Sequence, residues 1–380
     1  MQTVSTFNIW RLTWPTILSN MAFMLTGLVF LKIAGGMGID EVAAVTTGQR
    51  LFFILFAVMM GLSSGTTALV GRYWGAGNKE LAGRVAALSV IIFLVDGLLL
   101  SFIAIPFLEP LVSIFSLTPE AQALAVDFVY YTVLLAPPLL IVLVFSMAFR
   151  ATGDSKTPLW AAVVGAVLGV YLGIVFTYGW HGIEPMGLSG LAIGNGVGAI
   201  ITVIIFMLLW VLGALSFKPA NPLPGFVQNG RDLIKIGMPA AFEQVFFQAG
   251  LLVFLVFLAS YGNAAFATYG IGLSILGLMI VIAFSFSISS ATLVSQHLGA
   301  GDKQGAYNAG WRTMRTCLYI MIAGSLMMSL FAEEIARFMI NDPEVIALIV
   351  PFIYIISCSL PLMGIEFSMA GALRGAGDTL

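Results

Sequence analysis

The stretch LVGRYWGAGNK at residues 69–79 returns as LVSQHLGAGDK at residues 293–303, displaced by 224 residues. The same displacement carries FRATGD at 149–154 onto LRGAGD at 373–378, and Pro15 onto Pro239. Because the spacing is kept without a gap, the pattern indicates that one unit of about six hydrophobic helices is present twice. Duplicated helical bundles are typical of transporters, in which the substrate path runs between the halves.

The composition indicates a membrane protein. Hydrophobic residues make up 60% of the chain and charged residues only 9%, whereas a soluble domain carries roughly 25% charged residues. Apolar runs of about 20 residues recur, and each is long enough to cross a ~30 Å hydrocarbon core. Backbone polar groups in lipid need internal partners, so the runs are expected to be helices. The predicted fold class is an all-α polytopic membrane protein.

We predict ten spans in the chain, and the repeat arranges them in two parallel units. The expected spans are 12–34, 43–68, 86–107, 124–149, 159–179, 188–214, 236–259, 266–292, 309–331 and 346–370. After six crossings the chain returns to its starting side, so both six-helix units insert with the same orientation. Residues 1–216 are then an N-terminal lobe with spans one to six, 217–232 a cytoplasmic linker rich in Pro, Gly and Asn, and 233–380 a C-terminal lobe with spans seven to ten.

The second unit is shorter than the first. Leu380 corresponds to Lys156, after which the first unit continues through two further spans. The repeat therefore predicts twelve spans, of which about ten are present here, and we expect the chain to be a fragment of a twelve-span protein.

The distribution of basic residues predicts the orientation. Of the 16 lysines and arginines, all but Lys32, Arg50 and Arg337 fall on the side of the N-terminus or at its border. Short loops rich in Lys and Arg stay in the cytoplasm. We therefore expect a multi-pass protein of the inner or plasma membrane with a cytoplasmic N-terminus.

The repeated motifs resemble those of a known protein family. The GAGNK/GAGDK turns, the RATGD/RGAGD turns, and the segments WPTILSN (14–20) and MPAAFEQ (238–244) that open the first helix of each half resemble the multidrug and toxic compound extrusion (MATE) family. The resemblance implies a two-lobe antiporter of twelve helices that exports amphiphilic or cationic organic compounds by alternating access. It further implies Na⁺ or H⁺ as the coupling ion, with no other cofactor. The expected partners are a small amphiphilic substrate and the lipid bilayer; we expect a monomer and no nucleic acid.

Acidic residues within the spans are the first candidates for the coupling site. Asp96, Glu243 and Glu366 each lie inside a predicted helix, where an ionisable group is costly and is usually functional. A buried carboxylate has a raised pKa and can exchange protons, and once deprotonated it can bind Na⁺. We favour Glu243 as the coupling residue. Na⁺ at Glu243 is the one metal ion that we expect the protein to bind. In the family the seventh and tenth helices, which here carry Glu243 and Glu366, hold the acidic cation site.

Neutral polar residues near these acids are secondary candidates. Gln244 and Gln248 share a helix with Glu243, and Asn20 is the repeat equivalent of Gln244. Many prokaryotic MATE proteins carry an aspartate late in the first helix, where this sequence has Phe30. That difference favours the second half of the chain for ion coupling.

The repeated turns are interpreted as structural and conformational. Gly75, Gly77 and Lys79, with their equivalents Gly299, Gly301 and Lys303, predict tight turns whose lysines meet lipid headgroups. Arg150 with Asp154, and Arg374 with Asp378, are expected to form short charge pairs in the loops. Phosphate binding by the glycines is disfavoured, because no strand precedes them and the GxGxxG spacing is missing.

Three alternative functions remain open. A flippase for a lipid-linked precursor would need a more basic cavity than the few cations within the spans supply. A membrane enzyme would gather His, Cys or acidic residues, but His181 and His297 lie far apart and no metal or nucleophile motif is present. A channel would need a carbonyl-rich or charged filter loop. We therefore expect a transporter and no enzymatic activity.

Overall fold

The computed structural model describes residues 6–379 apart from 116, 214, 262 and 340–342. The helices are α1 (Thr6–Gly35), α2 (Ile39–Gly75), α3 (Lys79–Ala104), η1 (Ile105–Phe107), α4 (Leu108–Ser113), α5 (Pro119–Leu134), α6 (Ala136–Ala151), α7 (Lys156–Tyr178), η2 (Trp180–Gly182), α8 (Ser189–Val211), α9 (Phe226–Ala259), α10 (Asn263–Gly299), α11 (Lys303–Leu330), α12 (Ala332–Met339) and α13 (Pro343–Ala376). Among the described residues nine helices are long and apolar enough to cross a membrane, or ten if the bent pair α5–α6 counts as one span. The prediction of an all-α protein with about ten spans is confirmed.

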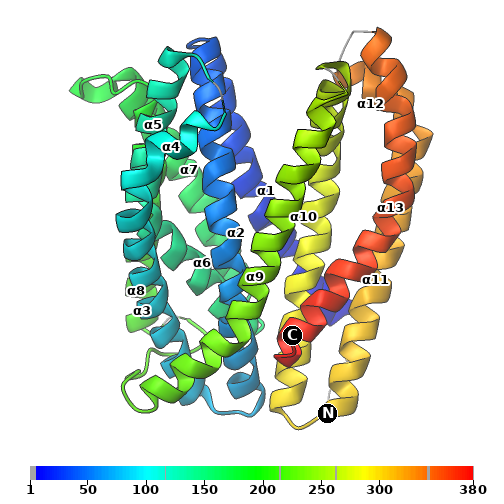
Figure 1. Ribbon diagram of the computed structural model, residues 1–380. Helices are drawn as coiled ribbons and strands as arrows, with labels where there is room; N and C mark the ends of the chain where they lie inside the picture. The colour runs from blue at the N-terminus through cyan, green and yellow to red at the C-terminus, as the bar shows by residue number, and fades with distance from the viewer. Residues whose placement is uncertain (1–5, 116, 214, 262, 340–342, 380) are drawn as a thin grey trace.

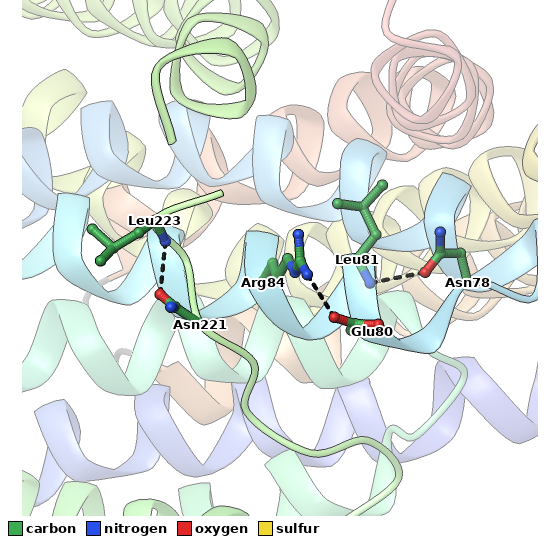
Figure 2. Close-up of polar contacts among 6 residues, drawn as sticks. All are labelled: Asn78, Glu80, Leu81, Arg84, Asn221 and Leu223. Atoms are coloured by element: carbon green, nitrogen blue, oxygen red, sulfur yellow. Dashed lines mark hydrogen bonds and ion pairs between the residues drawn. The ribbon is translucent and has the colours of Figure 1, made fainter. Parts of the chain in front are cut away.

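The repeated turns all lie at one end of the bundle, drawn at the bottom of Figure 1. We call this the motif end, defined by the turns 75–79, 152–156, 299–303 and 377–379. Gly77 and Gly301 have φ of 77° and 75°, a left-handed conformation that glycine adopts without steric cost and that ends a helix. Asn78 then caps α3 by accepting a hydrogen bond from the backbone N–H of Leu81 (3.0 Å; Figure 2). Asp302 caps α11 in the same way, over 2.7 Å.

One predicted span is broken. The segment 124–149 was expected to be a single helix, but the chain turns at Leu135 and α5 and α6 meet at 51°. The cause is the pair Pro137–Pro138, because proline has no N–H to donate and its ring clashes with the preceding turn. Pro137 in turn packs against Gly97 of α3, where a larger residue would overlap it.

The first helix of each repeat reaches the second helix of the other where the repeats meet. The N-terminal half of α9 packs mainly on α2, whereas α1 packs on α10 and also on α7 and α2 of its own repeat. Thr13 of α1 donates a hydrogen bond to Ser289 of α10 (2.9 Å). The repeat equivalents of Thr13 and Ser289 are Gly237 of α9 and Gly65 of α2. These two glycines lie against each other, and there is no room for a side chain at Gly65. The first helix of each repeat therefore contacts the second helix of the other.

Reciprocal contacts at the motif end show that the repeats are related by an approximate twofold axis. Gly75 of α2 lies against the backbone of Gln296 in α10, and Gly299 of α10 lies against the backbone of Arg72 in α2. Gln296 is the equivalent of Arg72, and Gly299 that of Gly75. The same contact is thus made twice, once in each direction, as expected for parallel repeats.

The connector between the repeats is fixed to the first one. Phe217 is buried among aromatic side chains of α6 and α8, and the carbonyl of Lys218 lies directly over Gly83 of α3. Figure 2 shows Asn221 beside α3, where its side-chain oxygen accepts a hydrogen bond from the backbone N–H of Leu223. α9 begins at Phe226, inside the segment expected to be linker. The connector therefore runs along the motif end and is anchored there by Phe217.

Candidate functional site

An ion pair between α9 and α13 forms the centre of the candidate site. Arg374 donates from its guanidinium to the Oε1 atom of Glu243 over 2.5 Å. The Glu243 side chain is 52% exposed and that of Arg374 16%, so the carboxylate remains open on one side. The pair joins two helices that are far apart in the chain.

Glu366 lies near this pair. It belongs to α13, eight residues before Arg374, which is ~12 Å along a helix at 1.5 Å per residue. The charges of Glu243 and Arg374 both act on Glu366. Two acids and one arginine thus occupy one region between α9 and α13, where the sequence predicted only the two acids.

The glutamines of α9, Gln244 and Gln248, are four residues apart and share one face of the helix, to one side of the exposed strip that carries Glu243. Gln244 is partly buried and Gln248 is 6% exposed. Both are therefore turned more toward neighbouring helices than Glu243 is. Their amides are within the same helix segment, but Glu243 alone of the three is bonded to α13.

The first repeat has no counterpart of this ion pair. The equivalents of Glu243 and Arg374 are Ser19 and Arg150. Ser19 donates its hydroxyl to the carbonyl of Pro15 (2.8 Å), and Arg150 is 5% exposed with its Nε atom unpartnered in the described part of the chain. The acid is therefore what distinguishes the two halves at this position.

The other predicted polar residues lie elsewhere. Asp96 is on α3 inside the first repeat, partly buried, and its Oδ2 atom has no hydrogen-bond partner among the described residues. Asn20 donates from Nδ2 to Ser285 of α10 over 3.0 Å and so helps to hold α1 against the second repeat. Neither residue is bonded to the Glu243–Arg374 pair.

The expected charge pairs within the RATGD and RGAGD turns are wrong. Asp154 instead accepts hydrogen bonds from two backbone N–H groups at the start of α7 (3.1 and 3.0 Å), which is a more favourable use of a carboxylate at a helix start. Arg374 reaches across to Glu243 and not to Asp378. Arg150 is buried away from Asp154.

The GAG turns serve packing and helix termination. Gly75 and Gly299 make the reciprocal contacts described above, and a Cβ at either would overlap backbone atoms of the other repeat. Lys79 and Lys303 each begin the third helix of a repeat and are exposed. Lys79 lies over the ring of Trp74, 5.3 Å from its centroid.

Polar side chains complete the closure of the motif end, and sequence reasoning missed them. Arg72 donates to the carbonyl of Ala376, and its equivalent Gln296 donates to the carbonyl of Ala151 over 2.7 Å. Each bond crosses between repeats. The repeat alignment could have identified these two donors, because each is a polar residue three positions before a GAG turn.

An all-helical membrane chain of two parallel repeats, closed by reciprocal contacts at one end and carrying a charged site between helices, has the architecture of a secondary transporter. The family model MatE matches residues 15–175 and 239–380. The protein therefore belongs to the MatE family of multidrug efflux transporters, and it is a transporter and not an enzyme.

Similar proteins agree with this assignment. The chain is 27% identical to the probable multidrug resistance protein NorM of Thermotoga maritima, over 97% of this chain and 80% of that protein. It is 24% identical to the multidrug resistance protein PmpM of Pseudomonas aeruginosa, over 96% of this chain and 77% of that protein. Among solved structures, the Vibrio cholerae MATE transporter VcmN in the bent form shares the fold, with a TM-score of 0.90 at 20% identity over 98% of this chain and 84% of that chain.

Proposed function

We propose that the protein is an antiporter that exports amphiphilic or cationic organic compounds in exchange for Na⁺ or H⁺. The coupling ion binds at Glu243 and Glu366. The two repeats rock against each other, so that the substrate site opens first to one side of the membrane and then to the other. The observation that carries the proposal is the half-exposed Glu243 carboxylate, bonded to Arg374 and close to a second acid.

The charges suggest how ion binding and movement are linked. In the structure the guanidinium of Arg374 occupies one side of the Glu243 carboxylate. A proton or Na⁺ at Glu243 neutralises the same negative charge, so it competes with Arg374. Arg374 lies in the last turn of α13, two residues before Ala376, which accepts the Arg72 bond from the other repeat. Loss of the ion pair therefore weakens the closed motif end.

The basic residues support a cytoplasmic motif end. Arg72, Lys79, Arg84 and Lys303 all lie at or within about two turns of the repeated turns, and positively charged loops stay in the cytoplasm. The closed motif end then corresponds to an outward-directed state of an inner or plasma membrane protein.

Reconstituted full-length protein gives the direct test. Efflux of a fluorescent organic cation from liposomes is followed while a Na⁺ gradient or a pH gradient is imposed in turn. We expect one gradient to drive transport and Glu243→Gln to abolish that drive, because an amide can neither bind a proton at neutral pH nor supply a charged ligand for Na⁺.

Glu80→Gln is the matched control, because Glu80 forms an exposed ion pair with Arg84 (2.6 Å) outside the proposed site. It should transport as the parent protein does. Unchanged gradient-driven transport in Glu243→Gln would contradict the coupling assignment.

A further inference from the structure

A pocket of about 240 Å³ opens at the motif end, away from the Glu243–Arg374 pair. One wall is Arg11 of α1, another is the turn between α6 and α7, and the third is Ser216 in the connector after α8. Thr152 and Ser216 join two of these walls through their hydroxyl oxygens, 3.1 Å apart. Three separate segments therefore line the pocket.

The lining is rich in positive charge and in hydrogen-bond donors. Arg11 and Lys156 both line the pocket, and neither forms an ion pair within the described part of the chain. The hydroxyls of Ser155 and Ser216 belong to the same lining, whereas the hydroxyl of Thr152 donates to the carbonyl of Phe149 (2.8 Å). Two cations with two hydroxyl donors form the kind of site that binds a phosphate group.

The one acidic residue of the lining forms no ion pair with these cations in the described part of the chain, so two cations and one carboxylate leave the lining positive by one charge. Asp154 is directed to the start of α7: its Oδ1 atom accepts from two backbone N–H groups, and its Oδ2 atom accepts from the hydroxyl of Thr157 over 2.6 Å. Arg150, two residues before Thr152, is buried and does not belong to the lining.

Aromatic side chains place the pocket at the level of the lipid headgroups. Trp10, next to Arg11, is 46% exposed, and Trp160, one helical turn after Lys156, is 68% exposed. Exposed tryptophans are enriched at membrane–water interfaces. Basic pockets between helices at this level bind the headgroups of anionic lipids.

We propose that this pocket binds a phosphate group, and that in the membrane the phosphate belongs to the headgroup of an anionic phospholipid. Arg11 and Lys156 hold its charge, while the hydroxyls of Ser155 and of Ser216, once turned from Thr152, donate to its oxygens. The bound lipid ties α1 to the start of α7 and to the connector, all within the first repeat.

Lipid titration of the full-length protein tests the proposal. Native mass spectrometry measures binding of phosphatidylglycerol and of phosphatidylcholine to the parent protein and to the variant Arg11→Gln/Lys156→Gln. We expect phosphatidylglycerol to bind about thirtyfold more weakly to the variant, equivalent to ~2 kcal/mol for two interfacial cations. Phosphatidylcholine binding should change little, because its headgroup has no net charge.

The matched control is Arg231→Gln/Lys235→Gln, which removes the same charge from two exposed residues near the start of α9, at the same end but outside the pocket. It should lower phosphatidylglycerol affinity by less than threefold. If the first double variant does not fold, Lys156→Gln against Lys235→Gln gives the same comparison, with an expected loss of about fivefold. Equal affinities in the matched variants would overturn the proposal.

The source of the phosphate is settled by a second titration, in lipid-free detergent. Sodium phosphate is added while the unfolding temperature is measured. We expect no saturable rise at millimolar phosphate, because a free ion lacks the acyl chains that hold a lipid beside Trp10 and Trp160. A saturable rise that is lost in Arg11→Gln/Lys156→Gln would instead assign the pocket to a soluble phosphate compound and overturn the lipid assignment.

Discussion

Asn78 and Asp302 occupy equivalent positions and begin the third helix of each repeat, but only Asp302 is charged. Both side chains accept a hydrogen bond from the backbone N–H three residues on. The N–H of Gly305 holds the pKa of the Asp302 carboxyl below its usual range, helped by the hydrogen bond from His297 (3.2 Å). The cap of α11 therefore depends on pH, whereas the cap of α3 does not.

Replacing each cap by alanine should separate these two cases. The folded pKa of Asp302 lies below the unfolded value of about 3.9, so its stabilisation is complete above that pH and is lost as the pH falls through the folded pKa. We expect Asp302→Ala to lower the unfolding temperature at pH 7 and to match the parent protein more closely near pH 3. Asn78→Ala should cost ~1 kcal/mol throughout. A deficit in Asp302→Ala that stays constant down to pH 3 would contradict the assignment.

Gly75 and Gly299 have no space for a side chain, because the backbone of the opposite repeat lies against them. We expect Gly75→Ala to destabilise the structure by roughly 1–3 kcal/mol, the usual cost of overpacking, measured by thermal unfolding in detergent. Gly250→Ala is the control, since no atom lies within contact distance of a Cβ there and alanine favours a helix. Equal stability of Gly75→Ala and the parent protein would show that the two helices are farther apart than described.

At the scale of elements, α9 lies between the two repeats. Its first half packs on α2, and its Glu243 is bonded to Arg374 of α13. A double-mutant cycle with Glu243→Gln and Arg374→Gln should give a coupling energy of about 1–1.5 kcal/mol in unfolding stability, since both partners are charged and Arg374 is largely buried. The pair Glu80–Arg84 on one helix should give ~0.3–0.5 kcal/mol. Equal coupling in the two cycles would show that the first pair does not hold α9 to α13.

Much of the element order could be predicted from sequence, because lipid requires long apolar helices and the repeat fixes their register. The glycine turns also followed from residue type. The partner of Arg374 could not be predicted, because charges four residues apart, as in RGAGD, suggest a local pair. The fold instead brings Glu243 within reach of Arg374, and in RATGD the start of α7 takes the Asp154 carboxylate. The break at Pro137 could have been found from the Pro–Pro pair, but the length of the apolar run concealed it.

At the scale of the whole molecule, the reciprocal contacts define how the repeats can move. Two contacts close the motif end, Gly75 with Gln296 and Gly299 with Arg72, and an approximate twofold axis relates them. Both contacts must therefore open together when the repeats separate. Because α1 packs on α10 and α9 packs on α2, these helices must slide or bend as the repeats separate. The Thr13–Ser289 hydrogen bond joins α1 to α10, so it breaks if these two helices slide past each other.

A cross-link between these two helices tests the central claim most directly. In a background with Cys317 and Cys358 replaced by serine, Thr13→Cys/Ser289→Cys places two thiols where hydroxyl oxygens lie 2.9 Å apart. The control is Thr66→Cys/Ser89→Cys, which joins α2 to α3 within one repeat across an equally buried pair of hydroxyls at 3.0 Å. Rocking of one repeat against the other predicts that oxidation stops gradient-driven efflux in the first protein, that reduction restores it, and that the control transports in both states. Undiminished efflux by fully cross-linked Thr13→Cys/Ser289→Cys protein would contradict the account.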